Sequence, residues 1–243
     1  MKVVAIIPAR YDSKRLPGKP LIKIHNKPLI QIVYENVEKT KLFYNVIIAT
    51  DDKRIYKAVK SFKGKVEMTS QKHKCGTERV AEVAYKINAD IFLNIQGDEL
   101  FITKEPLKKL IQTFSDTNVL VATLIHPISD IEEIKNPNKV KVIFDKNDFA
   151  IYFSRSPLPY KQNSKDKNFI YYGHIGVYAF RKSMLFKFSS LKQSALEQAE
   201  KLEQLRLIEN DIKIKVVKTD YSGFSINTEA DFNNALNYKQ ENH

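Results

Sequence analysis

The 243-residue sequence contains a single cysteine, Cys75. One cysteine excludes an intramolecular disulfide and fits a reducing compartment. The opening segment MKVVAIIPARYDSKR has an apolar run too short for the core of a signal peptide, and it lacks a small-residue cleavage site. No apolar run approaches the ~20 residues that a membrane-spanning helix requires. We therefore expect a cytoplasmic protein that does not bind a membrane.

Two common phosphate-binding motifs are missing as well. The sequence has neither GxxxxGK[ST] nor GxGxxG, which removes the main support for a P-loop ATPase or a simple dinucleotide-binding protein. Internal repeats, low-complexity tracts and linkers are also lacking. We predict one domain over residues 1–243, large enough to bury about 70–75% of the surface of the unfolded chain.

Acidic residues are too few to balance the basic ones, so the net charge is +12. Clustered lysine and arginine would indicate a nucleic-acid partner. Here the lysines are scattered over the whole chain, which favours a solvated, lysine-rich surface. A positive field would also attract a small anionic substrate. We expect no nucleic-acid partner, and a nucleic-acid-binding module stays an alternative that predicts steeply salt-dependent binding.

Strands and helices alternate along the first half of the chain, which is typical of a mostly parallel, doubly wound α/β sheet of the Rossmann-like kind. Apolar runs predict strands at 3–7, 46–49, near Val66, 91–95 and 119–125, and helical spacing predicts helices at 29–39, 52–62, 77–87 and 103–114. The pattern then changes, and we predict an inserted subdomain over about 138–180. Its predicted hairpin joins 140–145 to 149–154, and later elements follow at 176–180 (strand), 195–209 (helix), 213–217 (strand) and from about Thr228 (helix).

A basic loop, Pro8 to Leu21, directly follows the first predicted strand. It carries Arg10, Lys14, Arg15 and Lys19, with Ser13 and Gly18 among them. Ligands of open α/β sheets bind outside the carboxyl ends of the strands, and a triphosphate needs cations and backbone N–H donors. The loop is therefore a candidate phosphate-binding site, although a merely solvated basic loop is the alternative.

The loop sequence PARYDSKRLPGKPL resembles the N-terminal signature of the sugar-acid cytidylyltransferases, and most closely that of the 3-deoxy-manno-octulosonate (KDO) cytidylyltransferases. Six further segments resemble the family and follow its order: CGTERVAEV (75–83), NIQGDE (94–99), NPNKVKVIFD (136–145), YFSRSPLPY (152–160), GHIGVYAFR (173–181) and LEQLRLIENDIKIKV (202–216). The resemblance covers nearly the whole chain. It implies a nucleotidyltransferase fold and Mg²⁺-dependent transfer of CMP from CTP to the anomeric hydroxyl of KDO, which releases pyrophosphate and serves lipopolysaccharide synthesis.

The resemblance also implies which residues bind the nucleotide. They are Pro8, Ala9, Arg10, Ser13, Arg15, Lys19, Cys75, Gly76, Thr77, Arg79, Gln96 and Gly97, and the catalytic residues are Lys19, Arg10 and Asp98. Lys19 would stabilise negative charge on the triphosphate in the transition state, and Arg79 would bond an acceptor of the base. Thr77 could instead cap a helix. Cys75 is expected to be a small buried side chain and not a nucleophile.

Asp98 follows the predicted strand at 91–95, where a carboxylate is well placed for Mg²⁺, an ion that prefers oxygen ligands. The alternative is that Asp98 caps the next helix. The resemblance implies a second metal-binding aspartate near the C-terminus, but Asn227 stands there. Asparagine offers a carbonyl oxygen without charge, so we expect weaker metal binding at that position.

For the sugar acid, the resemblance implies five residues: Arg155, His174, Tyr178, Glu203 and Gln204. Arginine suits a carboxylate, and Glu and Gln suit hydroxyls; His174 could instead be a satisfied structural histidine, and Arg206 is expected to be structural. The family further implies a homodimer, with the inserted region at the interface. Two alternatives stay open: a cytidylyltransferase for another sugar acid, such as amino-KDO or a sialic acid, and a non-catalytic nucleotide-binding relative.

Overall fold

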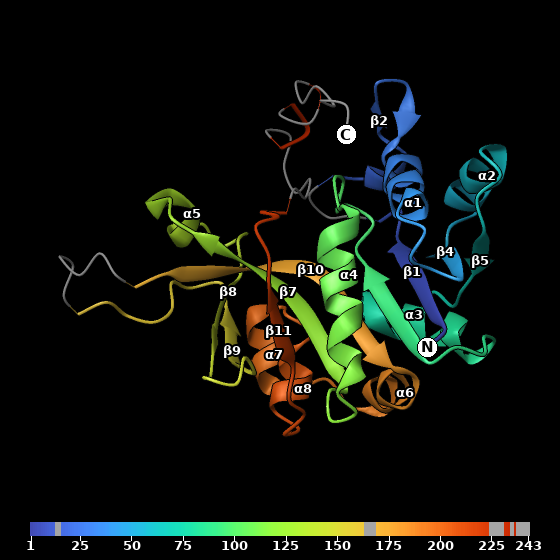
Figure 1. Ribbon diagram of the computed structural model, residues 1–243. Coiled ribbons are helices and arrows are strands. Elements are labelled where there is room, and N and C mark those ends of the chain that lie inside the picture. Colours follow the sequence, from blue (N-terminus) through green and yellow to red (C-terminus); the bar gives the residue numbers. More distant parts are fainter. Residues whose placement is uncertain (13–15, 163–168, 224–230, 234–235, 237–243) are drawn as a thin grey trace. The chain divides into compact units, whose positions relative to one another are not determined.

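The computed structural model describes residues 1–12, 16–162, 169–223, 231–233 and 236 (Figure 1). Ser13, Arg15, Asn227 and the predicted start of the last helix at Thr228 lie outside the described residues. The chain forms two compact units, one from Met1–Lys104 with Gly223–His243 and one from Glu105–Ser222. The prediction of one domain with an inserted region over about 138–180 stays a prediction.

The first unit contains parallel strands in the order β6–β1–β4–β5. Their bounds are β1 Val3–Ala9, β4 Asn45–Thr50, β5 Val66–Met68 and β6 Ile91–Ile95. Every residue of β1 and β6 is buried, as their continuous apolar runs predicted for strands covered on both faces. In register, Val3 of β1 faces Ile91 of β6, and Val4 faces Asn45 of β4.

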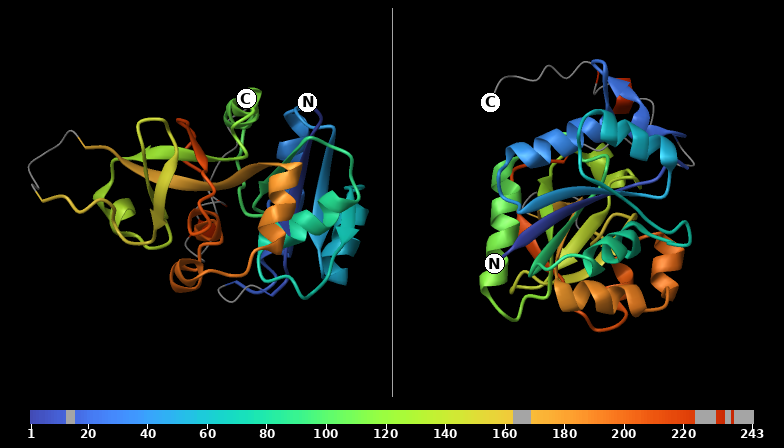
Figure 2. Two further views of the ribbon diagram at one scale, coloured as in Figure 1. Left: turned by 90° about the horizontal axis from the view of Figure 1, so that it is seen from below. Right: turned by 90° about the vertical axis from the view of Figure 1, so that its right-hand side faces the viewer.

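Helices cover both faces of these strands, which confirms the doubly wound α/β prediction (Figure 2). Helices α1 (Leu29–Lys39) and α2 (Lys53–Ser61) lie on one face, and α3 (Gly76–Tyr85) lies on the other. The chain steps from β1 to β4 to β5 in one direction and then returns to β6, so right-handed crossovers place α3 opposite the other two helices. The strand order therefore reverses between β1 and β6, which is where such sheets bind ligands.

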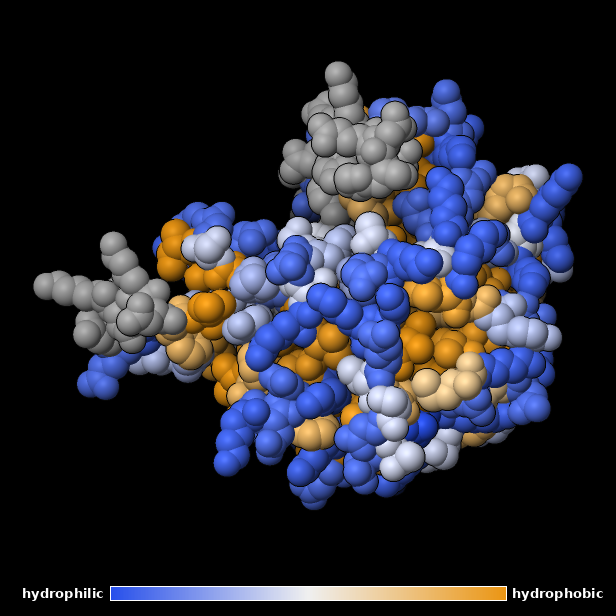
Figure 3. Space-filling view, viewed as in Figure 1, coloured by the Kyte–Doolittle hydropathy of each residue, from blue (hydrophilic) through white to orange (hydrophobic). Residues whose placement is uncertain are grey.

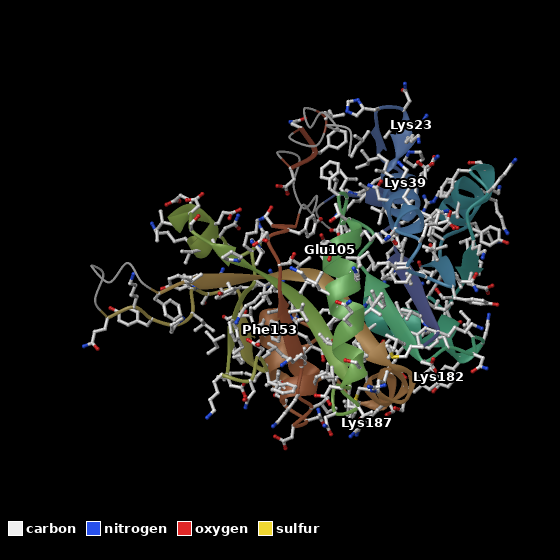
Figure 4. The ribbon with its side chains drawn as sticks, in the orientation of Figure 1. Lys23, Lys39, Glu105, Phe153, Lys182 and Lys187 are labelled. Atoms are coloured by element: carbon white, nitrogen blue, oxygen red, sulfur yellow. The ribbon has the colours of Figure 1, made fainter. Side chains whose placement is uncertain are left out.

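A small hairpin, which the sequence analysis did not predict, lies between the basic loop and α1. It pairs β2 (Lys23–Ile24) with β3 (Lys27–Pro28). The two turn residues, His25 and Asn26, have φ angles of 47° and 68°, the left-handed conformation of a type I′ turn. Lys23 lies on this hairpin and is exposed (Figure 4).

The second unit centres on an antiparallel pair of long strands, β7 and β10, with β11 parallel to β7. The predicted hairpin is confirmed, because β8 and β9 pair antiparallel on either side of a turn. The strands are β7 Val121–Ile128, β8 Lys141–Phe144, β9 Ala150–Ser154, β10 Tyr171–Arg181 and β11 Lys215–Lys218. The helices are α4 Lys104–Gln112, α5 Ile131–Lys135, α6 Lys182–Ser190, α7 Ala195–Glu200 and α8 Leu205–Ile208, and a 3₁₀ turn, Thr113–Ser115, extends α4.

The prediction of one helix over 195–209 is wrong, because two short helices occupy this range. Lys201 ends α7 in the left-handed conformation, with φ 54° and ψ 44°, which no α-helix can continue. A buried ion pair then ties the two helices together: both carboxylate oxygens of Glu197 accept hydrogen bonds from Arg206, at 2.7 and 2.8 Å. The structural role expected for Arg206 is confirmed, since its side chain is fully buried.

Hydrophilic side chains predominate on the face shown in Figure 3, with smaller hydrophobic areas between them. Among the helices in the described part of the chain, none is long and apolar enough to cross a membrane.

Candidate active site

The carboxyl ends of β1 and β6 approach closely at the point where the strand order reverses. A Cβ atom on Gly97 would lie 3.0 Å from the carbonyl oxygen of Pro8, so any larger residue here would press on that carbonyl. A Cβ atom on Gly76 would lie 3.3 Å from the Pro8 ring and 3.5 Å from Nε2 of Gln96. The structure therefore brings together predicted nucleotide-binding residues from three distant segments. Ala9, the last residue of β1, is buried beside them.

Lys19 and Asp98 form an ion pair at this place in the first unit. Their side chains are 15% and 22% exposed, so both keep some access to solvent. Lys19 reaches Asp98 because the basic loop folds back on itself: the Gly18 amide donates to the Tyr11 carbonyl at 2.9 Å, and Gly18 has a left-handed φ of 68°. The guanidinium of Arg54 stacks on the Tyr11 ring, with 3.3 Å from its central carbon to the ring centroid. A cation of the predicted phosphate-binding loop and a carboxylate that follows β6 are thus held together.

Arg10 is anchored by a segment that sequence reasoning missed. Its guanidinium donates to the carbonyl oxygen of His73, and the His73 imidazole pairs with the carboxylate of Glu82. Burial opposes ionisation of Glu82, but hydrogen bonds from the Ser70 amide and from His73 lower its pKa overall. His73 lies outside the family segments, and Glu82 lies in the segment 75–83 without a role assigned to it, so only their three-dimensional contact reveals this role.

Arg79 is fully buried on α3. Its guanidinium donates to the Asp51 carboxylate at 2.7 Å and to the Thr69 hydroxyl, which follow β4 and β5 respectively. Burial lowers the pKa of Arg79, and the charge of Asp51 opposes that shift. These contacts favour a role in holding the strand ends in place, and base recognition by Arg79 stays a prediction. Thr77, near the start of the same helix, accepts a hydrogen bond from Asn94 of β6 at 2.9 Å.

The second unit holds the residues predicted for the sugar acid. His174 and Tyr178 both lie on β10, with ring centroids 5.1 Å apart. Burial lowers the pKa of His174 to about 3, and repulsion from His126 adds to the effect, so the imidazole is neutral at pH 7. Burial also raises the pKa of Tyr178 well above its usual value, and the charge of Glu203 adds to it. The side-chain amide nitrogen of Gln204 is buried, and no residue in the described ranges accepts a hydrogen bond from it.

Arg155 is engaged by main-chain groups. Its guanidinium donates to the carbonyl oxygens of Glu200 at 2.7 Å and of Pro137 at 2.8 Å. The ammonium group of Lys141, which is fully buried, donates to three backbone carbonyls, including that of Arg155 at 2.6 Å. Binding of a carboxylate by Arg155 stays a prediction, and it would have to compete with these carbonyl contacts.

Asp98 is a chemically suitable ligand for Mg²⁺. Within the described residues no group of three or more His, Cys, Asp or Glu side chains gathers as a metal cage. Mg²⁺ does not need one, because it is usually held by one or two carboxylates, substrate phosphates and water. A single, partly exposed carboxylate at the carboxyl end of β6 fits that requirement.

Comparisons with known proteins agree on one family. The family model described as cytidylyltransferase matches residues 4–214. The chain is 46% identical to the 3-deoxy-manno-octulosonate cytidylyltransferase of Fusobacterium nucleatum subsp. nucleatum, covering 100% of this chain and 98% of the relative. It is 45% identical to the protein of the same name from Thermodesulfovibrio yellowstonii, over 95% of each.

One solved structure agrees with this family, and a more distant one shares the fold. A CMP:2-keto-3-deoxy-manno-octonic acid synthetase complexed with CTP superposes with a TM-score of 0.91, at 43% identity and over 98% of each chain. A 4-diphosphocytidyl-2C-methyl-D-erythritol synthase from Anaerococcus prevotii superposes with a TM-score of 0.65 at 17% identity, over 98% of this chain and 97% of that one, which indicates a shared fold.

Proposed function

The chain belongs to the 3-deoxy-manno-octulosonate cytidylyltransferase family, and we propose that it transfers CMP from CTP to KDO and releases pyrophosphate. The observation that supports this most is the ion pair between Lys19 of the predicted phosphate-binding loop and Asp98 after β6, in a chain that matches a CTP complex at 43% identity. The product, CMP-KDO, would serve lipopolysaccharide synthesis in the cytoplasm.

In this proposal the first unit binds the nucleotide. Gly97 and Gly76 keep side chains away from the Pro8 region, so the nucleotide can approach the backbone closely. Lys19 and Arg10 place two cations for the triphosphate, and Lys19 stabilises the charge that develops on the leaving pyrophosphate. The backbone of Lys19 is already fixed by the loop, so only its side chain has to turn from Asp98 toward the triphosphate.

The second unit supplies polar groups for the sugar acid. Neutral His174, Tyr178 and the amide of Gln204 suit the hydroxyls of KDO. The anomeric hydroxyl attacks the α-phosphate, and the bond to pyrophosphate breaks. No protein nucleophile is required, so the residues contribute by positioning and by charge stabilisation.

We also propose that Mg²⁺ is the cofactor and that Asp98 holds it. When bound, Mg²⁺ supplies positive charge that neutralises phosphate oxygens. Asn227 would add at most an uncharged carbonyl oxygen where the resemblance leads us to expect a second carboxylate. This departure also motivates the alternative that the chain binds CTP without catalysing transfer.

A homodimer is the proposed assembly. Ile151, Tyr160, Phe169 and Ile170, in or beside the region 138–180, are 54%, 88%, 44% and 53% exposed. Such large apolar side chains gather where proteins associate. Sedimentation of the native protein and of an Ile151→Lys, Ile170→Lys variant would test the assembly, and an unchanged dimer in the variant would contradict this interface.

Pyrophosphate release from CTP with Mg²⁺, with and without KDO, tests the activity. Asp98→Asn should abolish release, whereas Asp90→Asn, at the opposite end of β6, should leave it intact. If the Asn227→Asp variant released pyrophosphate and the native protein did not, the result would favour the non-catalytic alternative. Pyrophosphate release with amino-KDO or a sialic acid but not with KDO would assign another sugar acid as the substrate. No release with any of the three sugar acids would overturn the proposal.

A further inference from the structure

We propose that Thr123 is a positioning residue that holds His174 as the tautomer protonated on Nε2, so that Nδ1 accepts a hydrogen bond from a hydroxyl of the sugar acid. The inference rests on the proposed role of His174 in sugar binding. Neither sequence motifs nor the resemblance pointed to Thr123, because it lies inside an ordinary apolar strand, VLVATLI (119–125).

An irregularity in the pairing of β7 and β10 brings Thr123 to His174. Ile175 pairs with Leu124, but the next pair is Tyr178 with Thr123, so β10 has two extra residues at this point. The Thr123 side chain is fully buried there. Its hydroxyl oxygen lies 2.8 Å from the carbonyl oxygen of Val177, inside the irregularity, and 3.0 Å from Nε2 of His174.

The hydrogen atoms can be assigned from these two contacts. A hydroxyl has one hydrogen to donate, and a carbonyl oxygen can only accept. The Val177 carbonyl therefore takes the hydrogen of Thr123, and the hydroxyl oxygen can only accept from His174. Nε2 must then carry the proton. Since the His174 imidazole is neutral, its Nδ1 carries a lone pair and is an acceptor.

The surroundings hold the ring in place and leave Nδ1 available. Phe153, labelled in Figure 4, meets the imidazole edge to face at a centroid distance of 5.4 Å, and the Tyr178 ring lies at 5.1 Å on a tilted plane. No residue of the described ranges forms a hydrogen bond with Nδ1, and the His174 side chain is only partly buried. A sugar acid carries several hydroxyl donors, so it matches an acceptor fixed at this position.

The first test needs no substrate. Multiple-bond ¹H–¹⁵N spectra of ¹⁵N-histidine-labelled protein at pH 7.5 identify the protonated nitrogen of His174. We expect Nε2–H in the native protein and in Thr123→Ser, which keeps the hydroxyl. Thr123→Val keeps the shape but removes the acceptor, so the ratio of Nδ1–H to Nε2–H should rise about tenfold, as expected for the loss of one hydrogen bond. An unchanged ratio in Thr123→Val would overturn the proposal.

Kinetics then separate positioning from a purely structural role. In Thr123→Val, the KM for KDO should rise by up to about twofold, in proportion to the fall in the Nε2–H population that the spectra report, because only the competent tautomer binds, while the KM for CTP stays unchanged. Thr123→Ser should restore the KM for KDO. A lower melting temperature with an unchanged KM for KDO would show that Thr123 only supports the fold. If the native protein releases no pyrophosphate with KDO, the proposed function fails, and the spectra still decide whether Thr123 sets the tautomer.

Discussion

Replacing Arg79 by lysine should destabilise the protein far more than it weakens CTP binding. The Arg79 side chain is fully buried, and its planar fork donates to two acceptors at once, the Asp51 carboxylate and the Thr69 hydroxyl. Lysine carries a point charge on a flexible stem and cannot reproduce that fork. The contact that joins α3 to the ends of β4 and β5 would therefore be broken.

The size of the effect follows from burial. Removing one partner of a buried ion pair costs about 3–5 kcal/mol of unfolding free energy. The Asp51 side chain is 18% exposed and lysine keeps its charge, so water compensates part of the loss and we expect about 2–3 kcal/mol. For a chain of this length the melting temperature should fall by about 4–12 °C.

Urea unfolding and the KM for CTP, both measured well below the melting temperature, check this prediction. Lys86→Met is the matched control, because Lys86 and Glu67 form an ion pair whose side chains are 60% and 45% exposed. That pair should contribute less than about 1 kcal/mol. The opposite outcome would be a native melting temperature together with a KM for CTP raised more than about tenfold, which corresponds to a loss of ~1.4 kcal/mol of binding free energy. Arg79 would then recognise the base, and our reasoning would be wrong.

Three further predictions concern the site. Lys19→Met should lower kcat about 10²- to 10³-fold in the pyrophosphate assay, whereas Lys23→Met, at an exposed position, should change kcat little. Equal effects of the two substitutions would contradict the role of Lys19. Gly97→Ala should weaken CTP binding in calorimetry, because its Cβ would press on the Pro8 carbonyl at 3.0 Å; native affinity would refute this close approach. Burial lowers the pKa of His174 from 6.5 to about 3, so the unfolded chain binds the proton first and the free energy of unfolding should fall as pH drops from 6.5 toward 3. His174→Asn should remove up to about 1.4 kcal/mol per pH unit of that slope in urea titrations, and an unchanged slope would contradict the shift.

The order of the elements and the chemistry of the first loop were determined by the sequence itself. Runs that are almost entirely apolar identify strands such as 91–95, because a strand buried on both faces has few polar positions; Asn94 is the polar residue of this run, and it donates to Thr77. Helical spacing likewise predicted α1 with its observed bounds. The family segments extend over nearly the whole chain, so they identify the cytidylyltransferase family without any knowledge of contacts.

Only the tertiary structure decided which side chains meet. Hydrophobic periodicity records which face of an element is buried, but hydrogen-bond partners depend on strand order and register between distant segments. The break at Lys201 also escaped prediction, because a residue in the left-handed conformation leaves little trace in a helical pattern. For the same reason the burial of Arg79, the anchoring of Arg10 by His73 and the contact of Thr123 with His174 became visible only when the strands were placed side by side.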